Sequence, residues 1–284
     1  MNKLDFKIIK RSYFFIIPLL LQSCSSMYIP SVRSIPLLEK KGEFQGEAGV
    51  STNSIYVNGG YALTDKMAIA VNGQLSYRNF SDRYDLFTHI NERPPSSGCG
   101  FSILCFEPAD TRGKFAHRYG EFSMGRIDML PKVKKFRMEV FGGIGAGRAT
   151  DIDYFYNETR YKSDYCALFG QFNAGLKIKF LETGGSLRLV HSLFNYRVYS
   201  NTNDFLYEDI FGGFHLEPMI FARAGTENLK LALRCGFNLS FPIYLDKETS
   251  NYRGFDPVIG KWGYTPFHLS VGISYRIKSI KNEK

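Results

Sequence analysis

The 284-residue chain has few of the residues from which metal and redox sites are usually built. It contains five cysteines and five histidines. Their spacing gives neither a His-Glu-x-x-His motif nor a Cys-x-x-Cys motif, so no metal or cofactor is predicted. There is one tryptophan, and no apolar run reaches the ~18 residues that a membrane-spanning helix requires. The chain is therefore not predicted to be a bundle of transmembrane helices.

Glycine and aromatic residues, by contrast, are abundant, with 27 Gly, 25 Phe and 18 Tyr. Residues 229–241, LKLALRCGFNLSF, carry an apolar side chain at every odd position and a small or polar one at every even position. A period of two predicts an extended strand with one apolar face. By itself, the pattern leaves open whether that face packs in the core of a soluble sandwich or contacts lipid.

The same alternation recurs along the chain and predicts about ten strands. They are residues 43–50, 54–63, 67–79, 116–130, 134–149, 164–180, 184–199, 212–225, 228–242 and 266–278. Pro218 lies inside the eighth segment and is expected to need a bulge there, because proline cannot donate a ladder hydrogen bond. The predicted fold class is all-β.

The lengths of the connections favour lipid over a soluble core. Links after the second, fourth, sixth and eighth segments are tight, whereas those after the third, fifth, seventh and ninth are longer, with 80–115 and 243–265 the longest. Only the first link breaks this rule by being short. Alternating turns and loops are typical of an outer-membrane barrel whose turns face the periplasm. We therefore predict a transmembrane up-and-down antiparallel β-barrel over 43–278, followed by a periplasmic tail, 279–284.

The N-terminus predicts export from the cytoplasm. A basic stretch precedes the short apolar segment SYFFIIPLLLQS, which is the charge order of a secretory signal peptide, assigned here to 1–23. The segment ends in LQSC, which resembles a bacterial lipobox, and the resemblance implies a fatty acid on Cys24. Gln22 departs from the usual small or branched residue, so an ordinary signal peptide with a chance cysteine is the alternative. Residues 24–42 are then anchor and linker, with the anchor on the periplasmic side of the outer membrane.

The charge of the chain bears on its partners. The formal net charge is +9, and the predicted signal peptide accounts for part of that excess. A modest positive excess on an exported protein indicates an anionic surface nearby and not nucleic acid. The expected partners are outer-membrane lipid and an extracellular ligand or protein that contacts the loops 80–115 and 243–265.

Charged residues occupy the strand faces that would point into the barrel. They are Glu47, Glu121, Glu139, Glu217, Arg137, Lys177, Arg188, Arg223, Arg234 and Arg276. Because unpaired charges in a narrow space are costly, opposite signs should pair across the lumen and plug it. Glu139 is expected to pair with Arg137, Arg188 or Arg234. Glu217 is expected to pair with Arg223, Arg234 or Arg276. A narrow polar channel lined by the same groups is the alternative.

Aromatic residues crowd the ends of the strands on the long-loop side. They are Tyr154, Phe155, Tyr156, Tyr165, Phe194, Tyr196, Tyr199, Phe205 and Tyr207. An aromatic girdle at the membrane interface is the prediction, and a ligand platform is the alternative. The glycine-rich run GGIGAG, residues 142–147, lies within a strand, where glycine permits close approach, so no phosphate loop is predicted.

No catalytic site is predicted, because no convergent motif is present. His191 and Ser192 are adjacent and therefore point to opposite faces of a strand, which weighs against a lipid-modifying enzyme. For an outer-membrane protease, nothing in the sequence assembles the candidate acids Asp82, Asp151 and Asp153 with His117.

The cysteines of the longest loop predict a disulfide. Cys99 and Cys105 are close in sequence in a protein that matures in an oxidising compartment, so they are good disulfide partners. Cys166 and Cys235 fall in lipid-facing phases of separate strands and are expected to be unpaired, packed as small apolar groups.

The first quarter of the chain contains Tyr28 and Pro30, then Pro36–Leu37, 41–43 (KGE) and Tyr61–Ala62. In these features it resembles a family of lipid-anchored outer-membrane β-barrel proteins of Gram-negative bacteria. The family is largely without assigned activity, so the resemblance implies location and fold and carries over no catalytic residue.

Three functions remain: a structural or interaction barrel that acts through its outer loops, a narrow small-solute channel, and an outer-membrane enzyme.

Overall fold

The structure, a computed structural model, describes residues 31–52, 54–80, 113–127, 135–153, 159–244 and 267–278. Several predictions from the sequence lie outside these residues. They are the signal peptide, the lipid site at Cys24, the disulfide between Cys99 and Cys105, nearly all of the loops 80–115 and 243–265, and the tail 279–284.

The described part of the chain is built of β-strands. They are β1 (Phe44–Ser51), β2 (Ile55–Ala62), β3 (Met67–Phe80), β4 (Gly113–Arg126), β5 (Phe136–Asp153), β6 (Thr159–Lys177), β7 (Leu181–Tyr199), β8 (Phe205–Gly225), β9 (Leu229–Phe237), β10 (Leu239–Tyr244) and β11 (Phe267–Ile277). No helix in the ranges above is long and apolar enough to cross a membrane.

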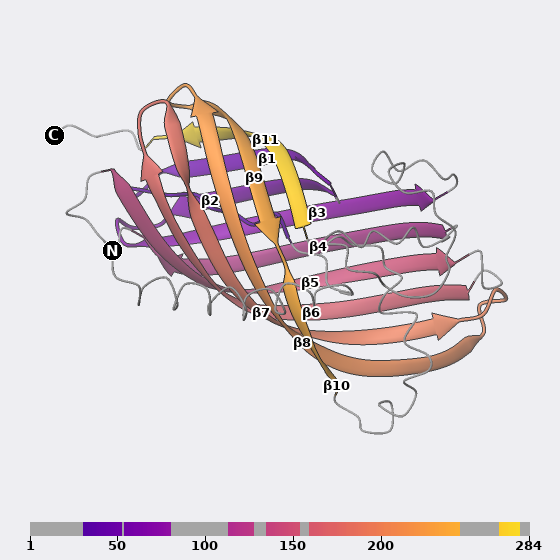
Figure 1. The fold of residues 1–284 in the computed structure, drawn as a ribbon. Helices are drawn as coiled ribbons and strands as arrows, with labels where there is room; N and C mark the ends of the chain where they lie inside the picture. Colours follow the sequence, from indigo (N-terminus) through magenta and orange to yellow (C-terminus); the bar gives the residue numbers. More distant parts are fainter. Residues whose placement is uncertain are drawn as a thin grey trace, which may run out of the picture.

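The strands form one closed antiparallel sheet, as the connection lengths predict (Figure 1). Each strand from β1 to β8 pairs with the next, β1 also pairs with β11, and β11 pairs with β9. A further pairing of β8 with β9 closes the ring. Because β9 and β10 pair with β8 in one continuous register, they are two parts of a single strand, and the barrel has ten strands.

Pro218 is accommodated without the expected bulge. On the β7 side it lies opposite Leu187, and the only register shift between β7 and β8 is at Val198/Tyr199. On the other side, the strand opposite is interrupted at Asn238, between β9 and β10. The missing N–H of proline therefore coincides with a gap in the hydrogen-bond ladder. Because the partner strand breaks at this place, no extra residue has to be inserted as a bulge.

The exterior of the barrel is apolar and its interior is polar. In β9, Leu229, Leu231 and Leu233 are 52%, 54% and 48% exposed, whereas Lys230 and Arg234 are 6% and 2% exposed. The same phase holds on the other strands, where Val71, Ile144, Leu189 and Ile273 are among the many large apolar side chains on the outside. Such a surface is stable in lipid and not in water, so the fold is a transmembrane β-barrel of the outer-membrane type.

The two ends of the barrel differ. At one end, here called the turn rim, lie the short links 63–66, 178–180 and 226–228, together with both ends of the barrel chain at residues 43 and 278. The turn rim also receives the link 127–135. The opposite end, here called the loop rim, receives the two longest connections, 81–112 and 245–266, together with the shorter links 52–54, 154–158 and 200–204. Strands β3–β8 have 14 to 21 residues and extend past the ends of the shorter β1, β2 and β11 at the loop rim (Figure 1). By the barrel rule the turn rim faces the periplasm.

Candidate functional site

The lumen contains the charged residues that the strand phase predicted. Seven of the ten are buried: Glu47, Glu139, Glu217, Arg188, Arg223, Arg234 and Arg276. Glu121, Arg137 and Lys177 are partly buried, and the last two lie near the turn rim, where they pair with Glu39.

A second occupant of the lumen is the chain itself. Residues 31–38, SVRSIPLL, here called the luminal segment, have no regular secondary structure and are buried from end to end. Ser31 contacts Arg188 in β7, whereas Leu38 lies nearer the turn rim, where the segment continues into 39–43 and then β1. The segment was predicted to be part of a linker, and its place inside the barrel was not foreseen.

The wall of the barrel binds the backbone of the luminal segment. Three arginines donate to its carbonyl oxygens: Arg234 to that of Arg33, Arg223 to that of Ile35 at 2.6 Å, and Arg276 to that of Pro36 at 3.0 Å. Side-chain amides of the wall also donate to the segment, Asn58 Nδ2 to Arg33 O and Gln171 Nε2 to Ser34 O. In the other direction the segment donates to the wall, Val32 N to Gln74 Oε1, Leu38 N to Glu139 Oε1 and Ser34 Oγ to Gly59 O. The segment is therefore bound as an extended peptide, with polar partners from both sides of the barrel.

Two glycines of the wall make room for the apolar residues of the segment. A Cβ on Gly60 would lie 2.6 Å from Pro36, and a Cβ on Gly175 would lie 2.9 Å from Leu37. Leu37 itself has a φ of 46°, an uncommon left-handed conformation for leucine, which the packing and the hydrogen bond from Arg276 to its carbonyl hold in place. The fit is thus both polar and steric.

One charge cluster joins β1, β8 and β9. Glu47 accepts from Arg223 Nε at 3.1 Å and from Arg234 Nη2 at 2.5 Å, and the hydroxyl of Tyr56 donates to it at 3.0 Å. Arg223 also pairs with Glu182 at 3.3 Å. This is the pairing across the lumen that the inward phase predicted.

A second cluster lies deeper in the barrel. Arg188 Nη2 donates to Glu121 at 2.7 Å and its Nε lies 3.7 Å from Glu217. Arg33 of the luminal segment is 3.7 Å from the same Glu217 carboxylate, and its guanidinium donates to the backbone carbonyl of Glu217. The expected partners of Glu217, among Arg223, Arg234 and Arg276, are therefore wrong, because the cation that reaches it across the lumen comes from a segment outside the strands.

The expected partner of Glu139 is also wrong. Its carboxylate accepts hydrogen bonds from the backbone N–H of Leu38 at 2.7 Å and from Asn173 Nδ2 at 3.1 Å, and it forms no ion pair with Arg137, Arg188 or Arg234 in the described residues. The backbone of the luminal segment and the Asn173 amide are thus the partners of this carboxylate.

Sequence reasoning missed five members of the network. They are Arg33, Glu39, Glu43, Glu182 and Lys230. Glu182 is in phase with Arg188 on β7, but the predicted strand began at residue 184 and so excluded it. Lys230 has the same even phase as Arg234 and was available from the alternation of 229–241. Glu43 begins the predicted strand 43–50 and has the same odd phase as Glu47, so it was also available, whereas Arg33 and Glu39 precede that strand, where no periodicity points inward.

Among the aromatic residues near the loop rim, Phe205 and Tyr207 are exposed, whereas three others face the lumen and not the lipid. Tyr165, Phe194 and Tyr196 are buried, so the predicted girdle is wrong for these three. The Tyr165 ring stacks on Tyr119 with centroids 5.7 Å apart and lies 5.2 Å from Phe194. Gly145 and Gly147 of the glycine-rich run provide the space, because a Cβ at either would lie within 2.4 Å of the Tyr119 or Tyr165 side chain. The run is part of β5, as predicted.

The catalytic candidates are placed apart. Ser192 Oγ lies 2.6 Å from His215 Nε2, a pair that the sequence did not suggest, while His191 packs against Phe214 instead. The other ring nitrogen of His215 bonds to the hydroxyl of Ser240 at 2.8 Å. Ser192 is fully buried, so no substrate reaches it in this arrangement.

The candidate residues of a protease-like site are described only at His117, whose Nε2 bonds to the hydroxyl of Tyr165 at 2.7 Å. The side chains of the candidate acids Asp82, Asp151 and Asp153 lie outside the described part of the structure. Within the described part, no group of three His, Cys, Asp or Glu side chains is arranged to hold a metal ion. Cys166 and Cys235 are free thiols, as predicted.

No family model matches the chain, and no curated protein matches it. Solved structures of outer-membrane proteins do match. The outer membrane protease OmpT from Escherichia coli is 13% identical with a TM-score of 0.43, over 83% of this chain and 93% of that one. A major outer membrane protein from Thermus thermophilus is 10% identical with a TM-score of 0.35, over 83% of this chain and 98% of that one. At these values, the likeness carries no activity over to this chain.

Proposed function

We propose that this protein is a lipid-anchored outer-membrane barrel with a closed lumen, which has a structural or interaction role through its loops at the loop rim. The observation that carries the proposal is the luminal segment, bound by its backbone to arginines of the wall. The fatty acid is proposed on Cys24, from the LQSC motif, with the anchor on the periplasmic side. Cys24 lies seven positions before Ser31, an extended span of at most ~25 Å, so the anchor stays close to the barrel.

Closure of the lumen has two sources that support each other. A barrel of this size is nearly filled by its own inward side chains. The luminal segment fills space between them, and its carbonyl groups accept hydrogen bonds from guanidinium N–H groups that are not used by carboxylates. A polar lumen filled in this way has no continuous water path, so the function is not that of an open pore.

The test is electrical. Purified wild-type protein in a planar bilayer is expected to show little or no steady conductance. Replacement of residues 31–38 by a Gly/Ser stretch of equal length removes every side-chain contact of the segment and is expected to produce discrete openings. A Gly/Ser replacement of the exposed residues 200–204 at the loop rim is the matched control and should stay closed. Large, stable conductance from the wild-type protein would reject the closed lumen.

A narrow small-solute channel is the second candidate. The observation in its favour is that the luminal segment is held by non-covalent contacts alone, against a wall lined by Arg188, Arg223, Arg234 and Arg276. A channel gated by release of the segment would show rare openings in the wild type with the unit conductance of the Gly/Ser variant. Absence of such openings separates the first proposal from the second.

The proposal assigns no catalytic role. The Ser192–His215 pair is the nearest approach to catalytic geometry in the described residues, and it lacks both exposure and a carboxylate on the second ring nitrogen. Activity against lipid or peptide that is lost in Ser192→Ala, while the barrel stays folded, would overturn this assignment.

A further inference from the structure

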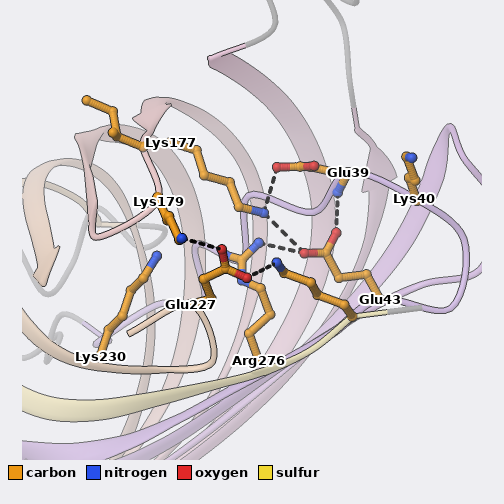
Figure 2. Close-up of a pocket in the computed structure, with 10 residues that line it drawn as sticks. Glu39, Lys40, Glu43, Lys177, Lys179, Glu227, Lys230 and Arg276 are labelled. Atoms are coloured by element: carbon orange, nitrogen blue, oxygen red, sulfur yellow. Dashed lines mark hydrogen bonds and ion pairs between the residues drawn. The ribbon is translucent and has the colours of Figure 1, made fainter. Parts of the chain in front are cut away.

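A cavity of about 530 Å³ opens at the turn rim (Figure 2). Its walls come from the ends of β6, β9 and β11, from the turns that follow β6 and β8, and from the chain that leaves the luminal segment. The volume is within the ~300–1,000 Å³ typical of small-molecule sites. By the barrel rule this mouth faces the periplasm.

The cavity is lined by more positive than negative charge. Its cationic residues are Lys40, Lys177, Lys179, Lys230, Arg276 and Lys278. Its carboxylates are Glu39, Glu43 and Glu227. Figure 2 shows the cationic side chains approaching from several strand ends around one space.

The floor of the cavity is a fixed cationic surface. Arg276 donates to Glu43 at 2.6 Å, and its side chain is 4% exposed. Lys230 is 6% exposed and pairs with Glu182 at 2.7 Å, behind the cavity wall. These pairs are buried and hold the guanidinium and ammonium groups in position, so the floor does not need to reorganise to receive a ligand.

The mouth of the cavity, in contrast, is held by weak and exposed pairs. Glu227 bonds to Lys278 at 2.6 Å and lies 3.9 Å from Lys179, and all three side chains are between 44% and 62% exposed. The hydrogen bond and the attraction from Lys278 hold the pKa of Glu227 below its ordinary value, so it is an anion at neutral pH. Exposed pairs of this kind contribute little to stability, so a ligand anion exchanges with such a carboxylate at little cost.

Glu39 has a comparable role on the opposite wall. Its carboxylate lies 2.8 Å from Lys177 and is 32% exposed, while Lys177 keeps Glu43 as a second partner at 3.2 Å. Displacing Glu39 therefore leaves Lys177 paired on one side and available to a ligand on the other. Glu39 and Glu227 thus occupy the positions that the oxygens of an incoming anion would take.

From this geometry we propose that the cavity at the turn rim binds a ligand with two or more phosphate-type anionic groups. Lysine ammonium groups suit phosphate as compact point charges. Lys177 and Lys179 come from the end of β6 and the turn after it, and Lys278 follows the end of β11. The phosphate can come from a lipid headgroup of the adjoining leaflet or from a soluble periplasmic compound, and the chemistry of recognition is the same for both.

The experiment uses inorganic pyrophosphate as probe. It is titrated calorimetrically into the full-length protein in nanodiscs of phosphatidylcholine alone, and saturable binding is expected. Lys179→Ala/Lys278→Ala removes two exposed cations without touching the buried floor, and the affinity should fall roughly tenfold. Lys66→Ala/Lys135→Ala removes the same charge from exposed positions of the turn rim outside the cavity and should bind like the wild type.

Two results would overturn the proposal. One is the absence of saturable binding to the wild type, and the other is an equal loss in both double variants, which would mean a general charge effect. Adding phosphatidylglycerol to the nanodiscs then identifies the source of the phosphate. A weaker apparent affinity for pyrophosphate indicates competition by lipid headgroups, whereas an unchanged affinity indicates a soluble ligand.

Discussion

Removal of the Glu47 carboxylate is the sharpest test of the charge network in the lumen. Glu47 is buried and is shared by two guanidinium groups, Arg223 at 3.1 Å and Arg234 at 2.5 Å. Glu47→Ala leaves both cations in an interior where they are 1% exposed. We expect the variant to insert into the membrane, because the apolar residues that drive insertion are on the outward face of the strands. We also expect it to unfold more easily, because two buried cations lose their carboxylate.

The magnitude follows from the burial. At ~4 Å and an effective dielectric constant of ~20, one such pair has an attraction of about 4 kcal/mol. Breaking a buried pair typically costs ~3–5 kcal/mol, since the remaining charge has no water. Arg223 retains Glu182 and the carbonyl of Ile35, and Arg234 retains the carbonyl of Arg33, so we expect the lower end, about 3 kcal/mol.

An exposed pair provides a matched control. Arg197 Nε lies 3.0 Å from Glu208, close to the 3.1 Å between Arg223 and Glu47, but both side chains are well exposed. Glu208→Ala is therefore expected to leave the free energy of unfolding unchanged within error. Glu47→Gln keeps the size of the side chain and removes its charge, so it should lie between the wild type and Glu47→Ala.

The assay is urea unfolding in detergent micelles, followed by far-ultraviolet circular dichroism and by the gel mobility of the unheated barrel. A loss in Glu47→Ala no larger than that in Glu208→Ala would refute the reasoning, because Glu47 is buried and paired with two guanidinium groups, whereas Glu208 is exposed and paired with one. A destabilised Glu47→Ala with an unchanged Glu47→Gln would assign the effect to shape and not to charge.

Three further predictions concern the anchor, the loop and the rim. Cys24→Ser should abolish incorporation of labelled fatty acid while export continues, and labelling that persists would contradict the lipid anchor. Mass spectrometry under non-reducing conditions should recover a peptide that links Cys99 to Cys105, and its consistent absence would count against the disulfide. Burial alone would raise the pKa of Glu43, but attraction from Lys177 and Arg276 outweighs it and lowers the pKa from its ordinary 4.5. The stability that Glu43 contributes is therefore present above pH 4.5 and should be lost as the pH falls below that value, a loss that Glu43→Gln should reduce in urea unfolding measured at each pH.

The barrel was predictable from the sequence because the patterns that specify it, the alternation within each strand and the lengths of the links, are local. In residues 229–241, a period of two sorts each side chain to one face, and the short and long links then identify which environment that face has. Burial of Lys230, Ala232 and Arg234 against exposure of Leu231 and Leu233 follows directly from that alternation. The ends of the strands were less predictable, and an error of three residues at the start of β7 was enough to miss Glu182.

The partners across the lumen were not predictable, because they depend on register and on tertiary position. The Arg188–Glu217 pair joins neighbouring strands at facing positions, which no pattern within either strand specifies. The Arg33–Glu217 pair joins residues 184 positions apart. Inward phase therefore predicted which charges meet in the lumen, and it did not predict which two of them pair.

The luminal segment was the least predictable element. The stretch SVRSIPLL has no period of two or of 3.6 and contains a proline, so by local criteria it is a linker. Its binding groups are distributed over β2, β3, β5, β6, β8, β9 and β11, so no local signal could reveal them. The one available signal was composition: Val32, Ile35, Leu37 and Leu38 are too apolar for an exposed linker, and all are at most 1% exposed.

The ion pairs and the luminal segment form a single network. Arg223 divides its donors between Glu47, Glu182 and the carbonyl of Ile35, so the same guanidinium closes a charge pair and binds the segment. Loss of the segment would therefore leave arginine donors unsatisfied in the lumen, and loss of a carboxylate would loosen the arginine that holds the segment. Since these contacts join residues up to 240 positions apart, they form only when the barrel has closed around the chain. The segment is thus a part of the folded core of this barrel, and in a protein whose outside is apolar that core is polar.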